Sequence, residues 1–312
     1  MRDEQPCFSA DRPSEDSISR RNLLKGAAGA AAVVAGSGAA GLAASCCVDE
    51  NYKATKGRIR QSACLWCFDP MPLETLAKHA AKVGIQSIEL IDPKDWPILK
   101  KYNLVCAISS SHGFVDGMNR KENHAMCIDK LRTAIDATSE AGFGNVITFS
   151  GYRKGMPDDV GLDNTVAGLK KIVGYAEKKK VTLCLEVLNS RVDTHPMKGH
   201  PDYMCDKVEW AVEACKRIDS PRMKILFDIY HVQVMQGDII TRIKKYHEYI
   251  GHYHTAGVPG RCEINEEQEI NYPPIMKAIV ETGYKGFVAQ EFIPTRKDKM
   301  LSMREAVKIC DV

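Results

Sequence analysis

Short apolar runs alternate with longer amphipathic segments along the chain from Arg58 onward. The short runs have the length of strands, and the longer segments repeat their apolar residues at helical spacing. This pattern predicts strands at 61–68, 86–91, 104–109, 145–149, 182–188, 223–228, 250–254 and 286–291. It predicts helices at 72–83, 94–102, 123–141, 163–180, 201–218 and 273–282, a helical stretch ending at 246, and a last helix within 296–309.

Eight strands alternating with helices over about 250 residues is the order and size of an α/β fold of the (β/α)8 TIM barrel type. A doubly wound sheet shares this alternation. However, the GxGxxG fingerprint of dinucleotide-binding sheets does not follow the first predicted strand. We therefore expect residues 58–312 to form a single barrel domain.

The first 45 residues have a different pattern, and we expect them to lie outside the barrel. The sequence Ser-Arg-Arg-Asn-Leu-Leu-Lys at 19–25 precedes an Ala/Gly-rich run over 26–44. A paired arginine, a run of small apolar residues and an Ala-Ala-Ser-Cys end are typical of a twin-arginine export signal. The run is also long enough to span a membrane, but its glycine and alanine content is poorly apolar for a stable span.

This interpretation makes 1–45 an export signal and 46–57 a linker. The twin-arginine export machinery is then a partner, and the periplasm is the destination. The end of the run, Ala-Ala-Ser-Cys46, weakly resembles a lipoprotein cleavage box, so a lipid anchor at Cys46 is the alternative to simple cleavage near Ser45. Export of an already folded protein would allow a metal to be loaded before transport.

The composition is that of an ordinary globular protein, with 44% hydrophobic and 27% charged residues. A net charge of +3 is too small to indicate a nucleic acid or a membrane surface as partner, so we expect no nucleic acid. The twelve cysteines form no evident disulfide framework. Cys64 and Cys67 have CxxC spacing, but no second pair completes a zinc site, so packing is favoured over a redox role.

Candidate metal ligands lie at the ends of four consecutive predicted strands. These residues are Glu186, Asp228, His254 and Glu291. The carboxyl ends of barrel strands form one face, which carries the chemistry in such barrels. Each acid follows apolar residues, where a carboxylate is costly to bury unless it is paired or bound to a metal. The set indicates one divalent metal ion, with Mn²⁺ or Mg²⁺ favoured and Co²⁺ or Zn²⁺ still open.

Five further residues are candidates for contacts with a substrate. Arg261 and Arg191 have the fork geometry that pairs with a carboxylate, although either could form a surface salt bridge instead. His231 follows Asp228 by three residues and has a helix-start cap as its alternative reading. His112 and Trp66 follow the third and first predicted strands and are candidates for lining a pocket.

Several sequence motifs resemble those of the hydroxypyruvate isomerase family, which belongs to the xylose-isomerase-like barrels. They are Glu-Val-Leu-Asn-Ser-Arg at 186–191, Phe-Asp-Ile-Tyr-His-Val-Gln-Val-Met-Gln-Gly-Asp at 227–238, Ile-Gly-His at 250–252, Val-Pro-Gly-Arg at 258–261, Glu-Ile-Asn-Tyr-Pro at 269–273 and Gln-Glu at 290–291. The match is dense from 186 onward, whereas the first half is similar in layout only. At His254 the chain resembles the related ketose 3-epimerases, because hydroxypyruvate isomerases typically carry glutamine there.

The resemblance implies a metal held by Glu186, Asp228, His254 and Glu291, with the two glutamates also acting as acid and base. It implies conversion of hydroxypyruvate to tartronate semialdehyde through an enediolate. It also implies a small hydroxy-keto acid or ketose as substrate, and a homodimer or homotetramer. His252, on the same strand face as His254, is expected to support the site.

Three alternatives remain beside this interpretation. A ketose 3-epimerase would use both glutamates on one carbon. An exported, non-catalytic sugar-binding protein would keep the barrel without the chemistry. An endonuclease of the same superfamily would need more histidines and a basic face, and the sequence indicates neither.

Overall fold

The computed structural model describes residues 49–194 and 197–312. The predicted export signal at 1–45 and Cys46 lie outside the described residues. Among the helices of the described part, none is long and apolar enough to cross a membrane. Residues 49–57, the described part of the predicted linker, are tied to the C-terminal end of the chain. There the carboxylate of Asp311 accepts hydrogen bonds from the backbone N–H groups of Thr55 and Lys56 and from the hydroxyl of Tyr52.

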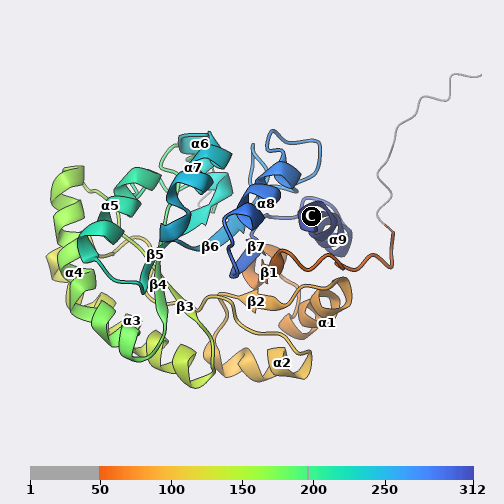
Figure 1. Cartoon of the computed structure of the whole chain (residues 1–312), viewed down its shortest axis with the longest axis horizontal. Coiled ribbons are helices and arrows are strands. Elements are labelled where there is room, and N and C mark those ends of the chain that lie inside the picture. The colour runs from red at the N-terminus through yellow and green to blue at the C-terminus, as the bar shows by residue number, and fades with distance from the viewer. Residues whose placement is uncertain (1–48, 195–196) are drawn as a thin grey trace, which may run out of the picture. The chain divides into compact units, whose positions relative to one another are not determined.

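Seven parallel strands form a curled sheet in the order β2-β1-β7-β6-β5-β4-β3 (Figure 1). The strands are β1 (Arg60–Cys64), β2 (Ser87–Glu89), β3 (Asn145–Thr148), β4 (Thr182–Glu186), β5 (Met223–Asp228), β6 (Ile250–Thr255) and β7 (Phe287–Gln290). Their side chains are almost all buried, as expected for a parallel sheet covered by helices.

The segment 104–109 lies between the two ends of this sheet and was predicted to be a regular strand. On one side the N–H of Leu90 donates to the carbonyl of Ile108, and on the other side the N–H of Ser109 donates to the carbonyl of Asn145. The prediction of a full strand is wrong because the ladder is interrupted in the middle, where the N–H of Ala107 bonds to a side-chain hydroxyl. The segment nevertheless links β2 to β3 and occupies the third of the eight barrel positions.

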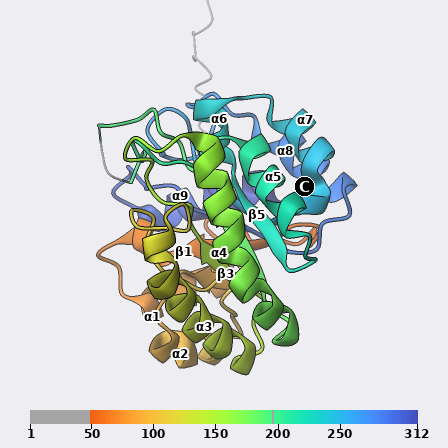
Figure 2. The ribbon, with the colours of Figure 1, turned by 90° about the vertical axis from the view of Figure 1, so that its left-hand side faces the viewer.

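Helices surround the sheet (Figures 1 and 2). They are α1 (Leu73–Val83), α2 (Trp96–Lys101), α3 (His124–Glu140), α4 (Asp158–Lys178), α5 (Val208–Ile218), α6 (Ile229–Met235), α7 (Ile239–Tyr246), α8 (Tyr272–Glu281) and α9 (Lys299–Cys310). In α5 the buried positions Val208, Ala211, Cys215 and Ile218 recur at helical spacing. Short 3₁₀ turns lie at Leu65–Phe68, Pro93–Asp95, Lys121–Asn123 and His247–Tyr249.

Two predicted helix starts are wrong. The helix predicted from 163 begins at Asp158, directly after a proline, with two aspartates in its first turn where the helix dipole favours them. The helix predicted from 201 begins only at Val208. The residues before it form tertiary hydrogen bonds instead, because the N–H of Met204 donates to the carbonyl of Gly151 and the carbonyl of Cys205 accepts from Leu188.

Candidate functional site

The carboxyl ends of β4 to β7 bring the four predicted metal ligands together. Glu186 and Asp228 are the last residues of β4 and β5, His254 is next to last in β6, and Glu291 directly follows β7. Each offers one ligand atom, and these atoms all lie within 4.8 Å of one another. All four side chains are buried, with at most 5% of any residue exposed.

The imidazole of His254 lies at the centre of the carboxylates. Its Nδ1 atom is 2.6 Å from Glu291 Oε2, 3.5 Å from Glu186 Oε1 and 4.0 Å from Asp228 Oδ2. Its other nitrogen, Nε2, is 2.8 Å from Oε1 of Glu89. One edge of the ring therefore faces the other three candidate ligands, and the other edge is held by the buried carboxylate of Glu89.

Burial and mutual repulsion leave the carboxylates with unequal proton affinities. Burial raises the pKa of Asp228 to about 7, and the neighbouring Glu291 adds to the rise while Arg261 opposes it. Burial also raises the pKa of Glu186. Burial alone would raise the pKa of Glu291 too, but Arg261 and His254 hold it well below its usual range. The three carboxylates and the imidazole lie close enough together that they could hold a divalent metal ion.

Arg261 supplies positive charge from the loop after β6. Its guanidinium pairs with Glu291 and lies 3.2 Å from Asp228 Oδ2. The side chain is 2% exposed and lies over the rings of Trp66 and Tyr230, at 5.1 Å and 5.6 Å from their centroids. Such cation–π contacts fix the orientation of the guanidinium.

Glu89 ends β2 and reaches across the barrel interior to β6. Its Oε1 lies 2.9 Å from His252 Nε2 and 2.8 Å from His254 Nε2, and none of these side chains is exposed. Burial would raise the pKa of Glu89, yet the two imidazoles lower it to about 2. The expectation that His252 supports the site agrees with this contact. The sulfur of Cys64 approaches the same oxygen at 3.7 Å.

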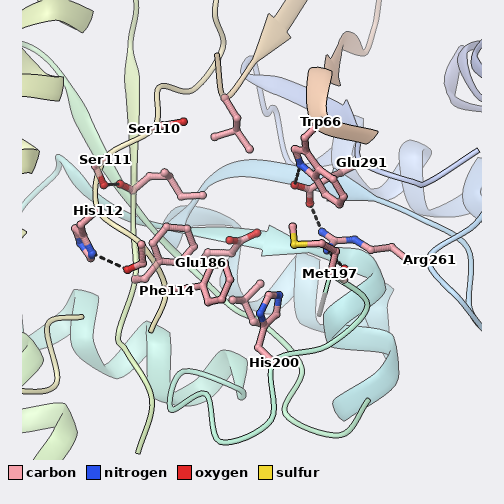
Figure 3. Close-up of a pocket in the computed structure, with 15 residues that line it drawn as sticks. Trp66, Ser110, Ser111, His112, Phe114, Glu186, Met197, His200, Arg261 and Glu291 are labelled. Carbon is pink, nitrogen blue, oxygen red and sulfur yellow. Dashed lines mark hydrogen bonds and ion pairs between the residues drawn. The ribbon is translucent and has the colours of Figure 1, made fainter. Parts of the chain in front are cut away.

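A cavity of about 270 Å³ opens beside the ligand set (Figure 3). Its wall is mostly apolar, with Glu186, Glu291 and Arg261 at one end. The remaining residues around it are Trp66, Leu90, Ser110, Ser111, His112, Gly113, Phe114, Ile147, Phe149, Leu188, Met197 and His200. A small, largely apolar pocket with a few convergent polar groups is typical of a small-molecule site.

The structure brings two of the predicted pocket residues, Trp66 and His112, to this cavity. The indole Nε1–H of Trp66 donates to Oε1 of Glu291 at 3.2 Å. His112 lies deeper, where its Nε2 is 2.9 Å from the hydroxyl of Thr148. Burial lowers the pKa of His112 to about 4, so its ring is neutral near pH 7.

The structure does not bring His231 and Arg191 to the cavity wall. His231 lies in the first turn of α6, where its backbone N–H donates to Oδ1 of the capping Asp228. Its ring Nδ1 is 2.6 Å from the amide of Asn189, and its Nε2 is 3.5 Å from Asp228 Oδ2. A contact between His231 and a substrate stays a prediction. Arg191 is exposed and donates to the carbonyl of Val234, as a surface residue would.

Sequence reasoning missed several cavity residues, among them His200 and Phe114. Their rings pack edge to face, with centroids 4.4 Å apart. Burial lowers the pKa of His200 to about 4. Both residues lie in loops far apart in the sequence, so no local pattern could have paired them.

Comparison with known proteins agrees with the fold. Residues 77–309 match the family model of the xylose isomerase-like TIM barrel. The chain is 32% identical over 248 residues to a 2-oxo-tetronate isomerase of Pectobacterium atrosepticum, covering 74% of this chain and 90% of that protein. It is 24% identical over 229 residues to a putative hydroxypyruvate isomerase of Homo sapiens, covering 73% of this chain and 77% of that protein.

The fold is also similar to that of solved structures. One is a D-psicose 3-epimerase of Clostridium cellulolyticum H10, with a TM-score of 0.66 at 16% identity, covering 81% of this chain and 97% of that one. At this identity the likeness shows the fold alone. The chain therefore belongs to the xylose isomerase-like TIM barrel family and is an enzyme of the aldose–ketose isomerase type.

Proposed function

We propose that this enzyme uses one divalent metal ion to isomerise a small 2-hydroxy carbonyl compound, with hydroxypyruvate to tartronate semialdehyde as the leading reaction. The observation that carries the proposal is the convergence of two buried glutamates, an aspartate and a histidine at one end of a small cavity. The isomerases among the relatives support the reaction class.

Glu186, Asp228, His254 and Glu291 would hold the metal ion. Their three carboxylates and one imidazole suit Mn²⁺ or Mg²⁺, and Co²⁺ or Zn²⁺ remain alternatives. When bound, such an ion stabilises negative charge that builds on the carbonyl and hydroxyl oxygens of a substrate.

Glu186 and Glu291 are the proposed acid and base. They come from β4 and β7, with β5 and β6 between them, so they approach the end of the cavity from two sides. One carboxylate would take the proton from a substrate carbon, and the other would return a proton to the neighbouring carbon. General acid–base catalysis of this kind contributes roughly 10²–10⁴-fold. The indole N–H of Trp66 orients Glu291 for this step by binding its Oε1.

Arg261 is the proposed partner of a substrate carboxylate. It is the only arginine or lysine that lines the cavity within the described residues. A planar guanidinium binds a carboxylate with two parallel hydrogen bonds, which would set the orientation of a keto acid beside the two glutamates. Arg191 lies too exposed for that role.

The second candidate is a ketose 3-epimerase, in which both glutamates act on one carbon from opposite faces. The imidazole of His254 favours it, because ketose 3-epimerases carry histidine at this ligand position. In that reaction the sugar has no carboxylate, so Arg261 would bind hydroxyl groups.

The test is a substrate screen of the purified protein. Metal is removed with a chelator, Mn²⁺ is added back, and hydroxypyruvate, 2-oxo-tetronate, fructose, tagatose and psicose are assayed in parallel. We expect metal-dependent turnover of a keto acid, and turnover of ketoses alone would favour the epimerase. Glu186→Gln and Glu291→Gln should each abolish turnover. If the wild type converts none of these compounds, the proposed substrates are wrong and a sugar-binding barrel becomes the better reading.

The proposal extends to where the enzyme works. The sequence of residues 1–45 supports export by the twin-arginine route to the periplasm, with lipid attachment at Cys46 as a variant of that route. Replacing both Arg20 and Arg21 by lysine should keep the protein in the cytoplasmic fraction. Size-exclusion chromatography with light scattering tests the expected homodimer or homotetramer.

A further inference from the structure

Glu89 is a buried carboxylate that the proposed chemistry does not use. It ends β2, whereas the two histidines that it contacts belong to β6, and β1 and β7 lie between these strands in the sheet. The contact therefore crosses the interior of the barrel. A buried carboxylate costs free energy unless it is hydrogen-bonded. The two histidines provide hydrogen bonds to Glu89, and the question is what Glu89 does for them.

One oxygen of Glu89 contacts the Nε2 atom of each of the two imidazoles. Oε1 lies 2.9 Å from Nε2 of His252 and 2.8 Å from Nε2 of His254. A carboxylate oxygen accepts hydrogen bonds, so each Nε2 must carry the hydrogen that it shares with this oxygen. In a neutral imidazole the other nitrogen, Nδ1, then holds the lone pair.

The Nδ1 atom of His254 points away from Glu89 and into the ligand set. It lies between 2.6 and 4.0 Å from oxygens of Glu291, Glu186 and Asp228. We propose that Glu89 is a positioning residue that fixes the proton of His254 on Nε2 and thereby directs the lone pair of Nδ1 to the metal position. This inference rests on the proposed metal-dependent function.

His252 completes the arrangement from the same strand. It lies two residues before His254, so both side chains point to one face of β6. Its hydrogen bond holds Oε1 from a second direction, which keeps the carboxylate from rotating away from His254. These separate roles explain why β6 carries two buried histidines: His254 is the proposed ligand, and His252 holds the carboxylate that orients it.

The test compares Mn²⁺ binding by the wild type and two variants of Glu89. Glu89→Met keeps the length of the side chain but removes the acceptor, and we expect about 10–100-fold weaker Mn²⁺ binding by isothermal titration calorimetry. Glu89→Gln keeps an amide oxygen that can accept from Nε2, so its loss should be smaller. Cys64→Ala is the matched control, because it removes the sulfur beside the same oxygen but keeps the carboxylate and both histidines, and it should bind Mn²⁺ within twofold of the wild type.

Pulsed electron paramagnetic resonance of the bound Mn²⁺ adds a readout that a general packing defect would not move. The wild type and Cys64→Ala should show coupling to a directly bound ¹⁴N nucleus, and His254→Ala should lose it. In Glu89→Met the coupling should be lost or altered, while Glu89→Gln should retain it. Melting temperatures without metal identify any variant that does not fold, and Glu89→Gln then carries the comparison.

Three results would overturn the inference. The first is wild-type Mn²⁺ affinity with unchanged ¹⁴N coupling in Glu89→Met. The second is a loss of Mn²⁺ affinity in Glu89→Gln as large as in Glu89→Met. The third is a second Mn²⁺ ion per chain, bound by Cys64, Glu89 and His254. A wild type that binds no Mn²⁺ or shows no ¹⁴N coupling would instead refute the proposed metal site, so the two failures are distinguishable.

Discussion

The buried ring of His112 should make the stability of the enzyme fall in mild acid. The residue is 3% exposed, and burial lowers the pKa of its ring from 6.5 to about 4. As the pH falls through 6.5, the unfolded chain takes up a proton at this ring and the folded chain does not, which favours unfolding. The contribution of His112 is therefore complete above pH 6.5 and is lost as the pH approaches 4.

The size of the effect follows from the two pKa values. At about 1.4 kcal/mol per pKa unit, the loss is about 2 kcal/mol by pH 5 and about 3 kcal/mol by pH 4. Urea unfolding at pH 8 and pH 5 measures it in the wild type and in His112→Gln, which cannot titrate. We expect the variant to lose about 2 kcal/mol less than the wild type between these pH values. His247→Gln, a change at an exposed histidine, is the control.

The reasoning is refuted if His112→Gln and the wild type lose the same free energy of unfolding between pH 8 and pH 5. It is also refuted if His247→Gln reproduces the behaviour of His112→Gln, because the effect would then not depend on burial.

Three further substitutions test other parts of the site. Trp66→Phe removes the N–H that binds Glu291, and we expect kcat/KM to fall about tenfold, the cost of a hydrogen bond to a charged group; an unchanged value would remove the indole from the site. Arg191→Ala should leave KM within twofold, and a tenfold rise would place this guanidinium on the substrate. Glu263→Gln weakens a buried carboxylate that accepts four hydrogen bonds from the segment after β7. It should lower the melting temperature by roughly 3–6 °C, whereas Glu266→Gln, on the exposed part of the same loop, should not.

Much of the barrel could be predicted because short strand-like runs alternate with longer amphipathic segments. The bounds 223–228 agree with β5, and the other regular strands were predicted within a few residues. The segment 104–109 also has a strand-like pattern. Its ladder of backbone hydrogen bonds is interrupted where the N–H of Ala107 donates to the hydroxyl of Ser87 on the neighbouring strand. Residues 201–207 have helical character, yet the backbone of Asp202, Met204 and Cys205 forms hydrogen bonds with other loops. Both errors come from tertiary hydrogen bonds, which local periodicity does not record.

The clustering of the four candidate ligands could be predicted because the ends of parallel strands share one face of the barrel. Glu186, Asp228, His254 and Glu291 each lie at or next to the end of a strand, and that alone places them near one another. The loop residues could not be placed in the same way. Arg191 and Arg261 were both candidates from the sequence, and Arg261 was favoured. The loop after β6 turns Arg261 inward, whereas Arg191 faces solvent.

The pair of histidines on β6 shows how a fold gives two similar residues separate tasks. Strand alternation predicts only that His252 and His254 share a face. The barrel then places them at two depths. The deeper ring is hydrogen-bonded to Glu89, whereas the outer ring has Glu89 on one edge and three other carboxylates on the other. Because Glu89 comes from a strand that is not adjacent to β6, closure of the barrel assembles this contact. Any change that shifts β2 against the rest of the sheet should therefore disturb His254 before it disturbs Glu186 or Asp228.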